Sequence, residues 1–168
     1  MPEAPPVVAD AGPLIILSAI GKLQLVGDLY GLVLIPDAVY SEVTTAGADR
    51  PGSAELLTAS WAIRVQVQPP PDLLLARDLG PGESEAITLA VRRHARLLLI
   101  DDRRARQIAE LGYGLRVKGA PGILVEAKRR GLIQAVQPLL ELMLARGYFL
   151  ARSVVDRAIS EAGEGALH

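Results

Sequence analysis

Six carboxylates of this 168-residue chain follow predicted strands or lie on the helices next to them, and if the sheet brings these elements together they could bind a cation or take part in hydrolysis. Each alone has a structural explanation, because Asp and Glu cap helix N-termini and interact well with the helix dipole. Together they would repel one another unless a cation neutralised them, and Mg²⁺ or Mn²⁺ prefers oxygen ligands. We therefore expect an all-oxygen Mg²⁺ or Mn²⁺ site of the kind that serves phosphoryl chemistry. The six candidate metal ligands are Asp10, Glu42, Glu83, Glu85, Asp101 and Asp102.

Other chemistries lack the residues that they need. The chain has no cysteine, which excludes disulfides, thiolate zinc sites, iron–sulfur clusters and cysteine nucleophiles. Its two histidines, His94 and His168, are not spaced as zinc ligands. The sequence contains no Walker A motif, no glycine-rich dinucleotide fingerprint after a strand and no G-x-S-x-G motif. Phosphate chemistry at a carboxylate-bound metal is the interpretation that these exclusions favour.

Short apolar runs alternate with helical patterns, which indicates an α/β domain with a mostly parallel sheet. Ligands of such sheets bind beyond the carboxyl ends of the strands. We expect Asp10, after the first strand, and Asp101 with Asp102, after the fourth, to meet at that edge. The expected strands are 7–9, 32–35, 63–67, 96–100 and 115–117. The expected helices are 13–20, 22–30, 37–43, 53–59, 83–94, 103–111, 121–130, 133–145 and 153–162.

Length and composition favour one domain over residues 1–168. Half of the residues are apolar and 22% are charged, which is enough for one well-formed core. No apolar run approaches the roughly 20 residues that span a bilayer, and the first residues lack the features of a secretory signal. We therefore expect a cytoplasmic protein with no membrane partner.

Charge is unevenly distributed along a chain whose net charge is −1. Residues 1–85 hold four basic and eleven acidic residues, whereas residues 86–168 hold fourteen basic and eight acidic residues. Basic side chains near the last acids could bind phosphates, or could simply form the solvated faces of helices. Because aromatic residues make up only 4% of the chain, we expect weak base selectivity. The candidate nucleic-acid contacts are Arg103, Arg104, Arg106 and Lys118.

Six blocks in order along the chain resemble the PIN domain, the metal-dependent ribonuclease domain of VapC-type toxins. The likeness is strongest to the PIN-like subgroup DUF3368. The blocks are VVADAGPLI (7–15), IPDAVYSEV (35–43), LGPGESEAI (79–87), LLIDDRRAR (98–106), KGAPGIL (118–124) and RGYFL (146–150). The resemblance implies a three-layer α/β fold with helices on both sides of a mostly parallel sheet.

The resemblance also implies roles for the acids. The four that match the catalytic positions of the family are Asp10, Glu42, Glu83 and Asp102. Glu85 and Asp101 stay open as alternatives to the last two. By analogy, these acids bind one or two Mg²⁺ or Mn²⁺ ions, and a water activated by the metal attacks the RNA backbone. The products would carry 5′-phosphate and 3′-hydroxyl ends.

The resemblance further implies an RNA substrate, a homodimer and a toxin role with a small antitoxin protein as partner. The apolar stripe within 133–145 could serve the dimer, although a core position is the more common use of such a stripe. Ala11 stands where PIN domains usually carry Thr or Ser, and Glu83 where many carry Asp. These departures leave an alternative, a catalytically inactive PIN-fold module that binds nucleic acid or protein.

Overall fold

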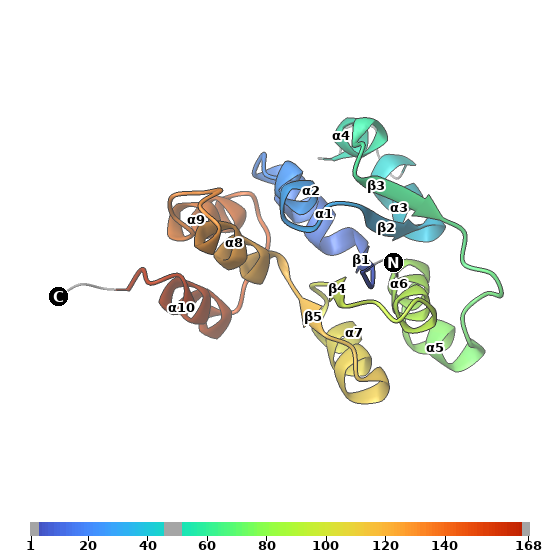
Figure 1. The fold of residues 1–168 in the computed structure, drawn as a ribbon. Coiled ribbons are helices and arrows are strands. Elements are labelled where there is room, and N and C mark those ends of the chain that lie inside the picture. The colour runs from blue at the N-terminus through green and yellow to red at the C-terminus, as the bar shows by residue number, and fades with distance from the viewer. Residues whose placement is uncertain (1–3, 46–51, 166–168) are drawn as a thin grey trace.

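A computed structural model describes residues 4–45 and 52–165, and it places a five-stranded sheet between layers of helices (Figure 1). All the strand pairs are parallel, in the order β3-β2-β1-β4-β5. The three-layer α/β fold expected from the sequence is therefore confirmed. The strands are β1 (Val7–Ala9), β2 (Val33–Pro36), β3 (Ala62–Val65), β4 (Leu97–Leu99) and β5 (Val117–Lys118).

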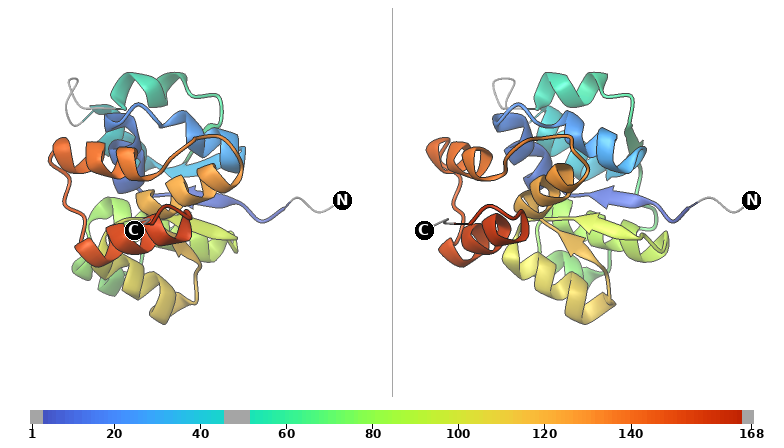
Figure 2. Two further views of the ribbon diagram at one scale, coloured as in Figure 1. Left: turned by 90° about the vertical axis from the view of Figure 1, so that its left-hand side faces the viewer. Right: turned by 60° about the vertical axis from the view of Figure 1, so that its left-hand side comes forward.

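Helices cover both faces of the sheet. One face carries α1, α2 and α8, with α9 and α10 outside α8, and the other face carries α5, α6 and α7 (Figures 1 and 2). Helix α3 packs on both α1 and α6. The helices are α1 (Ala11–Ala19), α2 (Gln24–Tyr30), α3 (Asp37–Thr45), α4 (Ser53–Thr58), α5 (Leu73–Asp78), α6 (Pro81–Arg92), α7 (Arg103–Gln107), α8 (Ala120–Arg129), α9 (Gln137–Ala145) and α10 (Arg152–Glu161).

The central strands are short apolar runs because helices cover both of their faces. Every residue of β1 is buried, as are the last two residues of β4. Leu14 and Leu17 of α1 pack into the core from one layer, and Ile87 of α6 packs into it from the other. The core fixes where β1 and β4 end, and therefore fixes the residues that follow them.

Strands β1 and β4 are neighbours in space but not in sequence. The chain runs outward from β1 through β2 to β3, and then returns to β4 on the other side of β1. The backbone N–H of Asp10 donates to the carbonyl of Leu99 at 2.8 Å, which fixes the end of β1 beside the end of β4. This reversal of strand order is the place where open α/β sheets bind their ligands.

Three helical segments differ from the sequence-based expectations. Helix α5 follows a proline-rich segment and was not expected, and its N-cap is Asp72, which accepts a hydrogen bond from the Leu74 amide. The helix expected over 133–145 begins at Gln137, where the distant Glu164 carboxylate accepts hydrogen bonds from the first amides. The helix expected over 103–111 is α7 followed by a π-helical turn, Ile108–Gly112.

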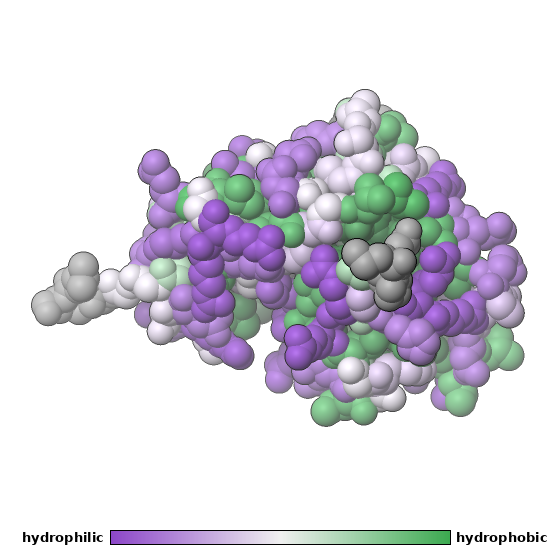
Figure 3. Space-filling model, viewed as in Figure 1, coloured by the Kyte–Doolittle hydropathy of each residue, from purple (hydrophilic) through white to green (hydrophobic). Residues whose placement is uncertain are grey.

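Two cavities lie at the amino ends of the strands, away from the six candidate acids. They measure about 710 and 700 Å³ and share Tyr30 and Arg96 in their walls. In Figure 2 the amino end of β1 points to the right, toward the N-terminus, so this edge faces the viewer in Figure 1. Figure 3, viewed from this edge, shows several small apolar areas separated by hydrophilic side chains. No helix in 4–45 or 52–165 has the length and apolar character to cross a membrane.

Candidate active site

Asp10 is a buried carboxylate at the end of the central strand. It follows β1 directly, is 4% exposed, and forms no side-chain capping bond with the first turn of α1. Burial raises its pKa from 3.8 to about 7. The nearby backbone amide of Ala11 lowers this pKa, whereas the charges of Glu83, Glu42 and Asp101 raise it. Asp10 therefore lies in a desolvated, negatively charged environment that a cation would relieve.

Asp101 approaches Asp10 from the neighbouring strand, β4. Its Oδ1 accepts a hydrogen bond from the backbone N–H of Ala120 at 2.8 Å, so the carboxylate sits at the N-terminus of α8. Gly119 makes this approach possible, because a Cβ at that position would lie 2.5 Å from Oδ1. The other oxygen, Oδ2, is buried and has no hydrogen-bond partner among the described residues.

The pKa of Asp101 is also perturbed. Burial raises it from 3.8 to about 6, while the Ala120 amide and the Arg106 guanidinium lower it. A buried carboxylate oxygen without a partner is costly in a folded protein. Within the described part of the chain, Oδ2 of Asp101 is therefore an unsatisfied buried acceptor at this edge of the sheet.

Glu42 and Glu83 lie on α3 and α6, two helices that pack against each other next to Asp10. Gly82, in the first turn of α6, lies between carboxylates: a Cβ there would be 3.4 Å from Oδ1 of Asp10 and 3.6 Å from Oε2 of Glu42. Glu83 is half-buried, and its carboxylate bends back toward Gly80, where an added Cβ would lie 2.6 Å from Oε2 of Glu83. Because both glutamates raise the pKa of Asp10, their charges are felt at its carboxylate.

The remaining two candidate acids bind helix N-termini. Oε1 of Glu85 accepts a hydrogen bond from the backbone N–H of Ala38 at 3.1 Å, in the first turn of α3. Asp102 is exposed and is the N-cap of α7, where its Oδ1 accepts from the Ala105 amide at 2.8 Å. The structure thus brings Asp10, Glu42, Glu83 and Asp101 together, and it directs the other two carboxylates to helix ends.

The donor set suits a hard divalent cation. All the converging atoms are carboxylate oxygens, and Gly82 leaves a space between two of the acids that a methyl group would fill. Within residues 4–45 and 52–165, no three Asp, Glu or His side chains stand close enough to hold an ion as they are. The acids thus fit such an ion in the chemistry of their oxygen atoms, while the distances between the described side chains do not form a ready-made site.

The four basic candidates are in different situations. Arg106 lies beside Asp101, and its guanidinium nitrogen would be 3.1 Å from a Cβ on Gly119. With Gly119 and Pro121 it lines a cavity of about 200 Å³. The side chains of Arg103 and Arg104 are exposed, and Arg104 lies 3.9 Å from Asp78. Lys118 donates to Glu126 at 2.8 Å, and this ion pair competes with any phosphate for the ammonium group.

Comparison with known families agrees with this geometry. The family model DUF3368, described as a PIN domain, matches residues 6–164. The chain is a PIN-domain protein. A search of curated proteins finds no match to it. The resemblance read from the sequence blocks is thereby confirmed, and the PIN domain implies a nuclease-type fold.

The sequence did not single out Gly82, Gly119 or the backbone amide of Ala120, all of which contact the candidate acids of this PIN domain. Gly82 makes room between Asp10 and Glu42, while Gly119 lets Asp101 reach the Ala120 amide. Both glycines lie in blocks that resemble the family, G-P-G-E and K-G-A-P-G. A glycine that directly precedes or opens a helix next to an acidic strand end is the signal that could have identified them.

Proposed function

We propose that this PIN-domain protein is a metal-dependent endoribonuclease whose ion is held by Asp10, Glu42, Glu83 and Asp101. One observation carries the proposal: the buried carboxylate of Asp10 and the partly buried carboxylate of Asp101, both with raised pKa values, lie near each other where the strand order reverses, and Oδ2 of Asp101 has no partner among the described residues. Such carboxylates are stabilised by a positive charge, and perturbed pairs of this kind cluster at functional sites.

Each acid has a distinct part in this proposal. A bound Mg²⁺ or Mn²⁺ ion would supply Lewis-acid chemistry, activating water and stabilising the charge of the phosphoryl transition state. Asp10 and Asp101 would hold the ion from two rigid strand ends, because their backbones are fixed by the sheet. Glu42 and Glu83 would complete the site from helices α3 and α6, and Glu42 is exposed enough to reach solvent and substrate.

Arg106 is the residue best placed to bind the substrate phosphate. It lies beside Asp101 and lines a cavity between α7, α8 and α10. Its planar guanidinium can bind two phosphate oxygens at once, which would orient the RNA backbone next to the acids. The exposed Arg103 and Arg104 would add contacts that depend on salt and carry no sequence information.

The direct test is cleavage of labelled single-stranded and structured RNA in Mg²⁺, in Mn²⁺ and in chelator. The proposal expects metal-dependent cleavage by the wild type that leaves 5′-phosphate ends, with loss of cleavage in Asp10→Asn and Asp101→Asn. Asp72→Asn is the matched control, because Asp72 caps α5 away from these acids. Cleavage that persists in chelator, or in both site variants, would contradict the proposal.

A second candidate function is binding without catalysis. Ala11 supplies no hydroxyl where PIN domains usually have one, and no three described acids already surround an ion-sized space. A folded wild type that binds RNA but cleaves none under any metal condition would favour this alternative. The toxin role, the antitoxin partner and the homodimer stay predictions, which the neighbouring gene and the mass in solution would test.

A further inference from the structure

Glu85 connects the two helices that carry the glutamates of the site. Its Oε1 accepts from the Ala38 amide at 3.1 Å, across 47 positions of sequence. Gly82, nearly one turn earlier on α6, lies against Val39 and Glu42 of α3. Helices α3 and α6 therefore run antiparallel where they touch, and Glu85 contacts the first turn of α3.

The chemistry of this contact suits a positioning role. A carboxylate that accepts from an amide in the first turn of a helix satisfies a donor that has no partner within the helix, and it interacts favourably with the helix dipole. Ala38 and Glu42 are four residues apart, so they lie on the same face of α3. Holding the Ala38 amide therefore ties the first turn of α3, one turn before Glu42, to α6.

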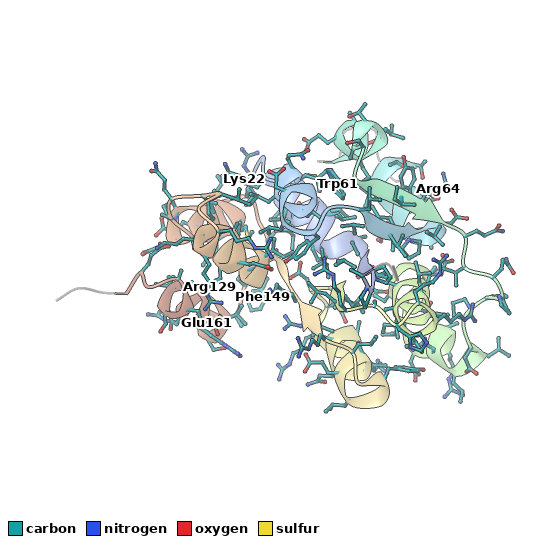
Figure 4. All side chains as sticks on the ribbon, viewed as in Figure 1. Lys22, Trp61, Arg64, Arg129, Phe149 and Glu161 are labelled. Carbon is teal, nitrogen blue, oxygen red and sulfur yellow. The ribbon has the colours of Figure 1, made fainter. Side chains whose placement is uncertain are left out.

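A second contact with the start of α3 comes from β3. Arg64 of β3 donates to Asp37 at 2.7 Å and lies over the ring of Tyr40. Figure 4 shows Arg64 at the outer margin of the molecule, and its side chain is 52% exposed. Because exposed ion pairs contribute little, the half-buried contact from Glu85 is the stronger constraint on α3.

We propose that Glu85 is a positioning residue that holds α3 against α6, so that Glu42 keeps its place beside Asp10, and that Glu85 does not itself bind the ion. This inference rests on the proposed metal-dependent function. It assigns Glu83 and Glu85, which are two residues apart, to different tasks: Glu83 faces the acids and Glu85 faces the helix that carries Glu42.

The test compares Glu85→Gln with Glu85→Ala by Mn²⁺ titration, using calorimetry or electron paramagnetic resonance on the full chain. Glutamine keeps an oxygen acceptor for the Ala38 amide but loses the charge that a metal ligand needs. We expect Glu85→Ala to weaken Mn²⁺ binding about tenfold, as loss of an outer-shell partner does, and Glu85→Gln to stay close to the wild type. Asp72→Ala is the matched control, because it removes a carboxylate from the start of α5, a helix that holds none of the acids.

A second readout follows α3 directly in the absence of metal. Hydrogen exchange at the Ala38 amide should accelerate in Glu85→Ala and stay slow in Glu85→Gln. Equal loss of Mn²⁺ affinity in both variants would identify Glu85 as a ligand and overturn the inference, and wild-type affinity in both would overturn it as well. A folded wild type that binds no Mn²⁺ would instead refute the proposed function, and this inference with it.

Discussion

Replacing Asp10 with asparagine should stabilise the metal-free protein at neutral and alkaline pH. Asparagine has nearly the shape of a protonated aspartic acid but carries no charge at any pH. In the wild type, burial and three neighbouring carboxylates oppose ionisation of Asp10, which raises its pKa to about 7. The variant removes a charge that the folded protein holds at a cost.

The sign and the size follow from proton linkage. The folded protein retains the Asp10 proton up to about pH 7, whereas the unfolded chain loses it near pH 3.8, so the free energy of unfolding falls as the pH rises between these values. One pKa unit corresponds to about 1.4 kcal/mol, so the loss amounts to at most about 4 kcal/mol. Asp10→Asn should avoid this loss, and for a chain of this length the gain corresponds to roughly 10 °C in Tm.

The assay is urea denaturation of both proteins in chelator from pH 4 to pH 8. We expect similar stability near pH 4 and a growing advantage of the variant toward pH 8. Adding Mn²⁺ at pH 8 should then stabilise the wild type by about 2.7 kcal/mol when the ion is at one hundred times its Kd. The stability of the variant should stay unchanged. Parallel pH profiles for the two proteins in chelator would refute the placement of Asp10 in a desolvated acidic cluster.

Three further predictions concern neighbouring residues. Asp102→Ala should lower the free energy of unfolding by about 1 kcal/mol in urea denaturation, because α7 loses its N-cap, whereas Asp102→Asn should keep the wild-type stability. Both variants should bind Mn²⁺ as the wild type does, and a lost Mn²⁺ affinity in Asp102→Asn would contradict the capping role. Gly82→Ala should fold normally, because the added Cβ would lie no closer than 3.4 Å to its neighbours. The variant should bind Mn²⁺ more weakly, because the methyl group fills the space between Asp10 and Glu42, and an unchanged Mn²⁺ affinity in calorimetry would argue against an ion there. Arg106→Ala should weaken RNA binding and lower the slope of log K against log salt by about 1, measured by fluorescence anisotropy, whereas Arg152→Ala, on the exposed face of α10, should change neither.

Much of the fold follows from local patterns in the sequence. The runs 7–9 and 97–100 are apolar throughout and each is followed directly by aspartate, which predicts buried parallel strands with acids at their ends. Strand order and the approach of Asp101 to Asp10 depend on the return of the chain to β4 beside β1, which the local patterns do not specify.

The choice between adjacent acids could not be predicted in the same way. Glu83 and Glu85 both lie near the start of one helix, and what separates them is the Ala38 amide, which comes from another element. Asp101 depends likewise on Gly119 and Ala120, which follow a different strand. The cap of α7 is a local contact, because Asp102 and its partner Ala105 are three residues apart, but the sequence left both Asp101 and Asp102 open as that cap. Contacts between distant segments decide which carboxylate faces which neighbour, and a single sequence does not specify them.

The central claim is that the carboxylates at the strand reversal bind the ion of a nuclease. The most direct measurement is anomalous scattering from a crystal of the protein grown with Mn²⁺. The account predicts a manganese peak at a coordination distance of about 2 to 2.5 Å from carboxylate oxygens of both Asp10 and Asp101, with Oδ2 of Asp101 as a ligand. A peak that involves Asp102 in place of Asp101, or no peak at this edge of the sheet at saturating Mn²⁺, would contradict it.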